Sequence, residues 1–76
     1  MEASWNGHVI TYRKYGKNTE ELVVDGKVYA EYVFRGLAKP NTMTAVVDGL
    51  EISAGYFKSN FITVNGQLIA STTRWI

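Results

Sequence analysis

Few side chains in this sequence could carry acid–base, nucleophilic or metal chemistry. The chain has one histidine, His8, together with two aspartates, five glutamates and no cysteine. A metal site usually needs three or four protein ligands, and His8 has no second histidine or cysteine to join it. No serine stands in a nucleophile motif, and no glycine pattern matches a phosphate-binding loop. We therefore predict that the protein is not an enzyme and has no catalytic residue, metal or cofactor.

Both aspartates have a structural explanation. Asp25 and Asp48 each stand directly before a glycine and between two apolar runs. A tight turn requires positive φ at such a place, which glycine adopts freely and aspartate adopts at low cost. The glutamates stand among strand-forming residues, a placement typical of solvent-facing positions or of cross-strand charge partners. Neither group indicates a catalytic pair of carboxylates of the glycosidase type.

The most regular feature of the sequence is an Asn-Gly or Asp-Gly dipeptide between apolar runs. It occurs four times, at Asn6-Gly7, Asp25-Gly26, Asp48-Gly49 and Asn65-Gly66. Between β-forming segments this dipeptide is the strongest local predictor of a two-residue hairpin turn. We therefore predict an opening strand and three hairpins, with seven or eight strands in all, over residues 8–15, 20–34, 42–57 and 60–74.

The composition favours an all-β protein. Valine, isoleucine, threonine and the aromatic residues occupy 30 of the 76 positions, whereas strong helix formers are scattered between glycines. A chain of this length forms one domain, over residues 1–76, with a thin margin of stability. We predict a single antiparallel meander of hairpins that forms a small sandwich or a partly open barrel of six to eight strands.

The hairpin over residues 20–34 differs from the others because both of its faces are apolar. If its turn has two residues and the strands are regular, one face carries Val23, Val28, Ala30, Tyr32 and Phe34. The opposite face then carries Leu22, Val24, Tyr29 and Val33. A β-bulge at the turn would instead shift one strand and exchange its faces.

A hairpin that is apolar on both faces needs cover on both, which is difficult to provide within a chain of 76 residues. We therefore expect a homodimer, or an unknown protein partner, at a surface that includes Tyr29 and Val33. The alternative is cover from within the chain, by the loop around Leu37 and by Trp75-Ile76.

One segment interleaves aromatic and cationic residues, at Tyr12, Arg13, Lys14, Tyr15 and Lys17. Single-stranded nucleic acid binds to such a combination, because bases stack on rings and phosphates pair with cations. The motifs of cold-shock and RNA-recognition domains are absent, and the same residues suit the solvated end of a hairpin. Nucleic-acid binding is therefore an alternative and not our first expectation.

Net charge and hydropathy point to no particular partner. The formal net charge is +1, and no apolar run approaches the length of a membrane span. No leader precedes the first strand, so we expect a cytoplasmic protein without a membrane partner. The function we favour is a non-catalytic protein-interaction or self-associating module. Single-stranded nucleic-acid binding is the first alternative, and a carbohydrate- or peptide-binding surface built on the tyrosines and tryptophans is the second.

Overall fold

The computed structural model describes residues 1–16, 18–33, 41–57 and 59–72. The described residues form eight strands: β1 (Glu2–Trp5), β2 (His8–Tyr15), β3 (Thr19–Val24), β4 (Lys27–Val33), β5 (Asn41–Val47), β6 (Leu50–Phe57), β7 (Ser59–Val64) and β8 (Gln67–Ser71). Within these residues there is no helix that is long and apolar enough to cross a membrane.

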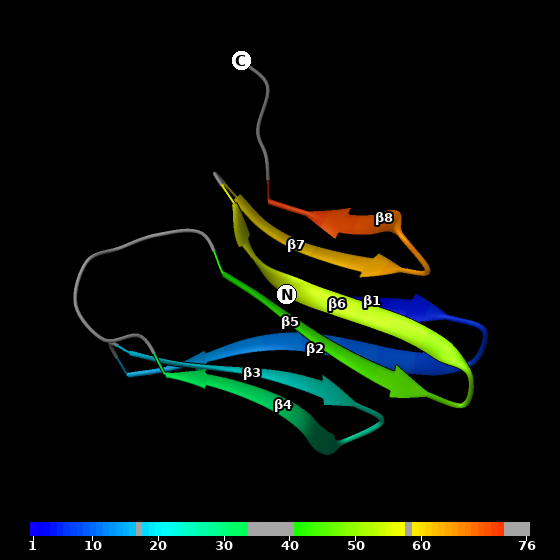
Figure 1. Ribbon diagram of the computed structural model, residues 1–76, viewed down its shortest axis with the longest axis horizontal. Coiled ribbons are helices and arrows are strands. Elements are labelled where there is room, and N and C mark those ends of the chain that lie inside the picture. Colours follow the sequence, from blue (N-terminus) through cyan, green and yellow to red (C-terminus); the bar gives the residue numbers. More distant parts are fainter. Residues whose placement is uncertain (17, 34–40, 58, 73–76) are drawn as a thin grey trace.

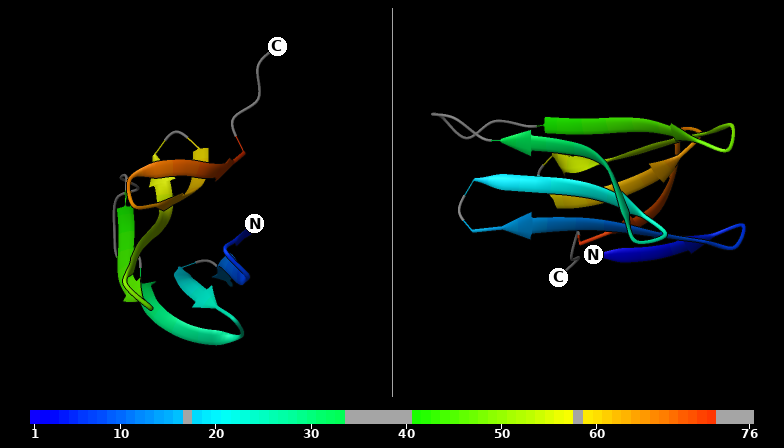
Figure 2. Two further views of the ribbon diagram at one scale, coloured as in Figure 1. Left: turned by 90° about the vertical axis from the view of Figure 1, so that its right-hand side faces the viewer. Right: turned by 90° about the horizontal axis from the view of Figure 1, so that it is seen from below.

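The strands form two antiparallel sheets, each a four-stranded meander (Figure 1). The first sheet has the order β1-β2-β3-β4, and the second has the order β5-β6-β7-β8. The sheets are not closed into a barrel; they face each other, and β4 and β5 lie side by side where they meet (Figure 2). The prediction of an all-β meander of hairpins is confirmed, with the meander interrupted between β4 and β5.

All four predicted turn dipeptides form tight hairpin turns. The asparagine or aspartate of each dipeptide has φ between 49° and 53°, and the following glycine has φ between 79° and 83°. Positive φ at both central residues is the geometry of a type I′ turn, whose twist matches that of the flanking strands. The turn at Asn6-Gly7 joins β1 to β2. No residue range was predicted for β1, and with this strand the total is eight.

The core lies between the two sheets and draws on both. Its buried side chains are Ile10, Tyr12, Leu22, Val24, Met43, Val47, Ile52, Ala54, Ile62 and Val64. In β2, β5 and β6 these residues follow the alternation of a strand with one buried face. Apolar burial between two sheets of this size is the main stabilising contribution, because the chain has no disulfide.

A β-bulge in β4 changes the expected faces of the hairpin over residues 20–34. Val23 pairs with Val28, but Leu22 pairs with Ala30, so Tyr29 is an extra residue in β4. Leu22 and Ala30 therefore both face the core, whereas the regular register had put them on opposite faces. The bulge, which was the alternative at this turn, is the arrangement that the structure adopts.

The two sheets are structural repeats of each other. The β7–β8 hairpin has a bulge at the same place as the β3–β4 hairpin. In the first sheet the amide of Val9 donates to Asp25 Oδ1 over 2.9 Å, and the amide of Asp25 donates to the Val9 carbonyl over 2.8 Å. In the second sheet Glu51 and Asn65 make the same two hydrogen bonds, at 3.0 and 2.7 Å. Residues 4–30 thus correspond to residues 46–70.

Candidate interaction surface

The outer face of the first sheet is built from the side chains of β2, β3 and β4 that point away from the core. Alternation along β2, and the pairing of β2, β3 and β4, place these side chains in three rows across the sheet. The rows are Thr11–Val23–Val28, Arg13–Glu21–Glu31 and Tyr15–Thr19–Val33. We call these nine residues, together with Val9, the first outer face.

Apolar side chains occupy both ends of the first outer face. Val9, Tyr15, Val28 and Val33 are 41 %, 46 %, 44 % and 42 % exposed. Val23 lies between β2 and β4 on this face and is only 5 % exposed, although it does not belong to the core cluster. At the end nearer the Asp25-Gly26 turn, these valines therefore form a continuous apolar area on the outside of the sheet.

The middle row of the first outer face is charged. Arg13 Nη2 lies 2.9 Å from Glu21 Oε1, Arg13 Nε lies 3.3 Å from the same oxygen, and the guanidinium stacks on Tyr15 at 4.9 Å from the ring centroid. Glu31 lies directly opposite Glu21 and is exposed, and no ion pair of Glu31 is present within the described ranges. Two carboxylates opposite each other repel, so this row has an unbalanced negative charge at β4.

The outer face of the second sheet is different in chemistry. Its central residues are Thr44, Ser53 and Thr63, and the hydroxyls of Thr44 and Ser53 hydrogen-bond to each other over 2.9 Å. On the outer face of this sheet the exposed apolar residues are Val46 and Leu68, on β5 and β8, the two edges. Tyr56, which is also exposed, lies on the same side of β6 as the core residue Ala54. Apolar residues that are scattered singly on a surface are common and do not indicate a binding site.

Both residues predicted for the protein interface are exposed and lie on β4, an edge strand of the first sheet. Val33 belongs to the first outer face, and it is 42 % exposed. Tyr29 is the bulge residue, 39 % exposed, and its ring lies 5.2 Å from the ammonium of Lys27. Tyr29 lies on the edge strand β4 and has no partner in β3, so the strand pairing assigns it to neither face. The covering residues of the alternative, Leu37, Trp75 and Ile76, lie outside the described residues.

The residues predicted to contact nucleic acid do not share one face. Tyr12 is 2 % exposed and belongs to the core, so its ring is not available for stacking on a base. Arg13 and Tyr15 lie on the first outer face and contact each other. Lys14 points to the opposite side, where its ammonium lies 5.8 Å from the Tyr12 ring and 5.7 Å from the Tyr56 ring. Lys17 lies outside the described residues.

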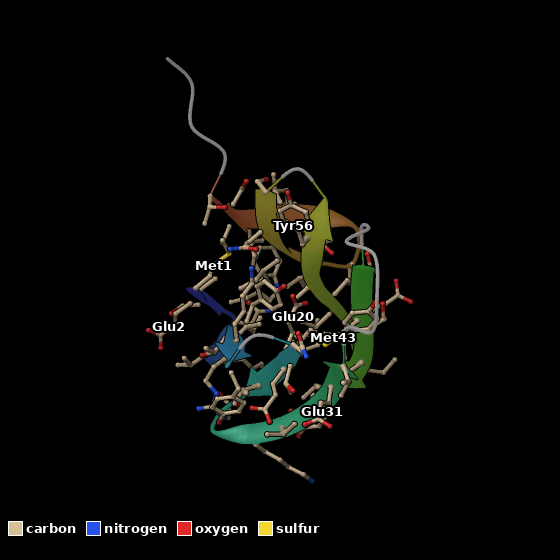
Figure 3. The ribbon with its side chains drawn as sticks, turned by 90° about the vertical axis from the view of Figure 1, so that its left-hand side faces the viewer. Met1, Glu2, Glu20, Glu31, Met43 and Tyr56 are labelled. Atoms are coloured by element: carbon tan, nitrogen blue, oxygen red, sulfur yellow. The ribbon has the colours of Figure 1, made fainter. Side chains whose placement is uncertain are left out.

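A cavity of about 460 Å³ opens between the two sheets near Lys14. Its lining residues are Met1, Thr11, Tyr12, Arg13, Lys14 and Asn60. Figure 3 views the molecule from one end and labels Met1 and Tyr56 there, on the first and the second sheet. Neither His8 nor a carboxylate is among the described lining residues.

His8 joins the two sheets electrostatically. Its Nδ1 lies 2.6 Å from Asp25 Oδ2, in the β3–β4 turn, and its Nε2 lies 3.5 Å from Asp48 Oδ2, in the β5–β6 turn. Neutral imidazole has one N–H, so donation to both carboxylates requires the imidazolium. The sequence did not predict this cluster, because its members come from turns that are distant along the chain. Leu50 is the corresponding residue of the second sheet. An apolar residue at the equivalent position favours a structural role for His8.

The pKa values within this cluster shift as the geometry requires. The hydrogen bond to Asp25 has the largest effect and raises the pKa of His8. Desolvation, the second largest effect, lowers this pKa, and the charges of Asp25 and Asp48 raise it, so that the net shift is upward. The pKa of Asp25 is lowered, first by the backbone hydrogen bond from Val9 and then by His8. Both shifts favour the charged forms of His8 and Asp25 in the folded protein, which is the result expected for an ion pair. Asp25 therefore has a role beyond its turn conformation.

Comparison of the chain with protein-family models, with curated proteins and with solved structures found no significant match. The fold and the surface therefore define the class of the molecule: an all-β protein of two four-stranded antiparallel sheets, one of which exposes apolar side chains at both ends of its outer face.

Proposed function

We propose that the protein is a non-catalytic interaction module that associates with a second copy of itself through the first outer face. The observation that carries this proposal is the pair Val9 and Val28, which are exposed on either side of the buried Val23. A sheet surface of this kind is stabilised when another sheet packs on it at about 10 Å. In the matching area of the second sheet Glu51 and Thr63 stand at the positions of Val9 and Val23, and only Leu68, at the position of Val28, is an exposed apolar residue.

The face is also suited to a reversible contact. The apolar residues lie at its two ends and are about half exposed, and the charged row between them keeps the free surface hydrated. Interfaces of non-obligate complexes are, taken as a whole, about as polar as the rest of the protein surface, and the first outer face shares this mixed composition, with its charged residues in the middle row. We therefore propose a dimer in exchange with a folded monomer.

Sedimentation equilibrium from low to high micromolar concentration tests the proposal. We expect the wild-type chain to show a concentration-dependent dimer. Val28→Lys and Val33→Lys should each weaken it by about tenfold or more, because each buries a charge in the interface. Circular dichroism checks that the variants are folded, and Tyr29→Ser measures separately whether the sheet edge takes part.

Two matched controls place the same charge on the other sheet. Leu68 occupies the position in β8 that Val28 occupies in β4, and Val46 is also exposed on the second outer face. Leu68→Lys and Val46→Lys should leave the dimer unchanged. A wild-type chain that stays monomeric at high micromolar concentration, or controls that weaken the dimer as much as Val28→Lys, would refute the proposal.

A further inference from the structure

The charged row of the first outer face restricts how two copies can pack. The row runs across the strands from Arg13 on β2 through Glu21 on β3 to Glu31 on β4. Arg13 is fixed by Glu21 and Tyr15 but keeps 44 % of its side chain exposed. Glu31 is exposed and faces a carboxylate within its own chain. One end of the row thus presents a cation, and the other presents an anion that is not balanced.

Two copies that pack face to face can be related by a two-fold axis in the plane of the interface, in one of two directions. An axis along β3 reverses the strand order, so β2 of one copy lies over β4 of the other. Each row then lies over the same row of the partner, with the two rows running in opposite directions. An axis across the strands keeps β2 over β2, so Arg13 lies over the partner's Arg13 and Glu31 lies over the partner's Glu31. Only the first direction brings opposite charges together, at the two ends of the row. Glu21, which is paired with Arg13 of its own chain, lies over the partner's Glu21 in both directions.

We propose, resting on the self-association above, that the dimer axis runs along the strands and pairs Arg13 of each copy with Glu31 of the other. The partner's Arg13 then neutralises the repulsion between Glu21 and Glu31. The two remaining rows are also complementary. The two Val23 side chains meet at the centre of one row, where Val28 faces the partner's Thr11. In the other row Tyr15 faces the partner's Val33, with the two Thr19 side chains between these contacts.

A second copy is the occupant that this face specifies. The face carries both the unbalanced carboxylate and, on the far side of β3, the guanidinium that would balance it. Charge complementarity at an interface fixes orientation and disfavours wrong partners. A partner without this arrangement would leave Glu31 without a counterion in the interface, whereas Arg13 would keep only Glu21 of its own chain.

The first variant that tests the arrangement is Glu31→Arg. Within one chain this substitution places a cation on each side of Glu21, so the fold should be as stable as that of the wild type. Across the interface it places like charges together twice, and we expect the dimer dissociation constant to rise about tenfold or more. Glu51→Arg makes the same charge change on the exposed outer side of the second sheet and should have no effect.

The double variant Arg13→Glu with Glu31→Arg reverses the row and distinguishes the two axes. With the axis along the strands, opposite charges face each other again, so the double variant should recover a homodimer close to the wild type in affinity. When the wild type and the double variant are mixed, every charged contact between them is repulsive. Native mass spectrometry should therefore detect both homodimers and little heterodimer.

Each other outcome overturns the arrangement in an identifiable way. With the axis across the strands, the mixture would instead favour the heterodimer, because Arg13 would then face a glutamate. If the wild type dimerises and Glu31→Arg dimerises equally well, the row does not lie at the interface and the arrangement fails while self-association stands. If the wild type remains monomeric in these measurements, the arrangement and the proposed function fail together.

Discussion

The two sheets of this protein share one backbone plan and differ in what they present to solvent. Each is a four-stranded meander with type I′ turns, a bulge in its last strand and the same pair of hydrogen bonds between its second strand and its last turn. On the outside, Val23 and Val28 of the first sheet stand where Thr63 and Leu68 stand in the second.

This difference separates positions that maintain the fold from positions that do not. Leu22 and Ile62 correspond and are both completely buried, as are Val24 and Val64 at 1 % and 0 % exposed. The outward positions between them vary from valine to threonine without a change in strand pairing. An apolar outer residue is thus not required by the meander, which is the reason that we assign the first outer face to association.

The largest effect should come from the corresponding core positions. Leu22→Ala and Ile62→Ala each remove most of a buried side chain and leave a cavity between the sheets, so each should lower the free energy of unfolding by about 2–5 kcal/mol. Urea unfolding measures both. If one of them costs less than about 1 kcal/mol, its sheet does not share the core and the comparison of the sheets as equivalent layers fails.

A smaller effect should come from His8, which contacts a turn of each sheet and whose equivalent in the second sheet is Leu50. The pKa of His8 is raised in the folded state, so its ion pairs stabilise the fold fully below the unfolded pKa, near 6.5. That stabilisation is lost as the pH rises through the raised pKa. We therefore expect the wild type to lose stability relative to His8→Leu as the pH rises from about 6.5 through the raised pKa of His8.

Urea unfolding of the two proteins at several pH values measures that difference, and groups that titrate in both cancel. Asp25→Asn is a useful control, because its amide oxygen can still accept the Val9 amide as Asn65 accepts that of Glu51. It should reduce the pH dependence while the turn is kept. An identical pH profile for the wild type and His8→Leu would show that the histidine does not join the sheets.

The sequence was sufficient to predict the positions of the turns, but it was not sufficient to predict the register in which β3 and β4 pair. A type I′ turn depends on two adjacent residues, so Asn-Gly and Asp-Gly located all four hairpins. The bulge at Tyr29 depends on packing between strands, and it decided which residues of β4 face outward. Val33 was predicted at the surface, whereas Val28 was assigned to the same face as Ala30 and Tyr32.

Contacts between segments that are distant in sequence also could not be predicted from the spacing of residues. His8 meets Asp25 and Asp48 only because two turns of different sheets lie at one end of the molecule. The aromatic and cationic run from Tyr12 to Tyr15 was visible, but strand alternation divides it between the core side and the outer face. Neighbouring residues of a strand point in opposite directions, so a mixed run on one strand rarely forms one surface.

The most direct test of the central claim compares the two sheets in one experiment. Amide ¹H–¹⁵N NMR spectra of the wild-type chain, recorded during dilution from high to low micromolar concentration, locate the residues whose environment changes on dissociation. We predict shifts at Val9, Arg13, Val23, Val28 and Glu31, with the amides of β6 and β7 unchanged. Shifts concentrated on β5–β8, or spectra that do not depend on concentration, would contradict the assignment of the first outer face as the association surface.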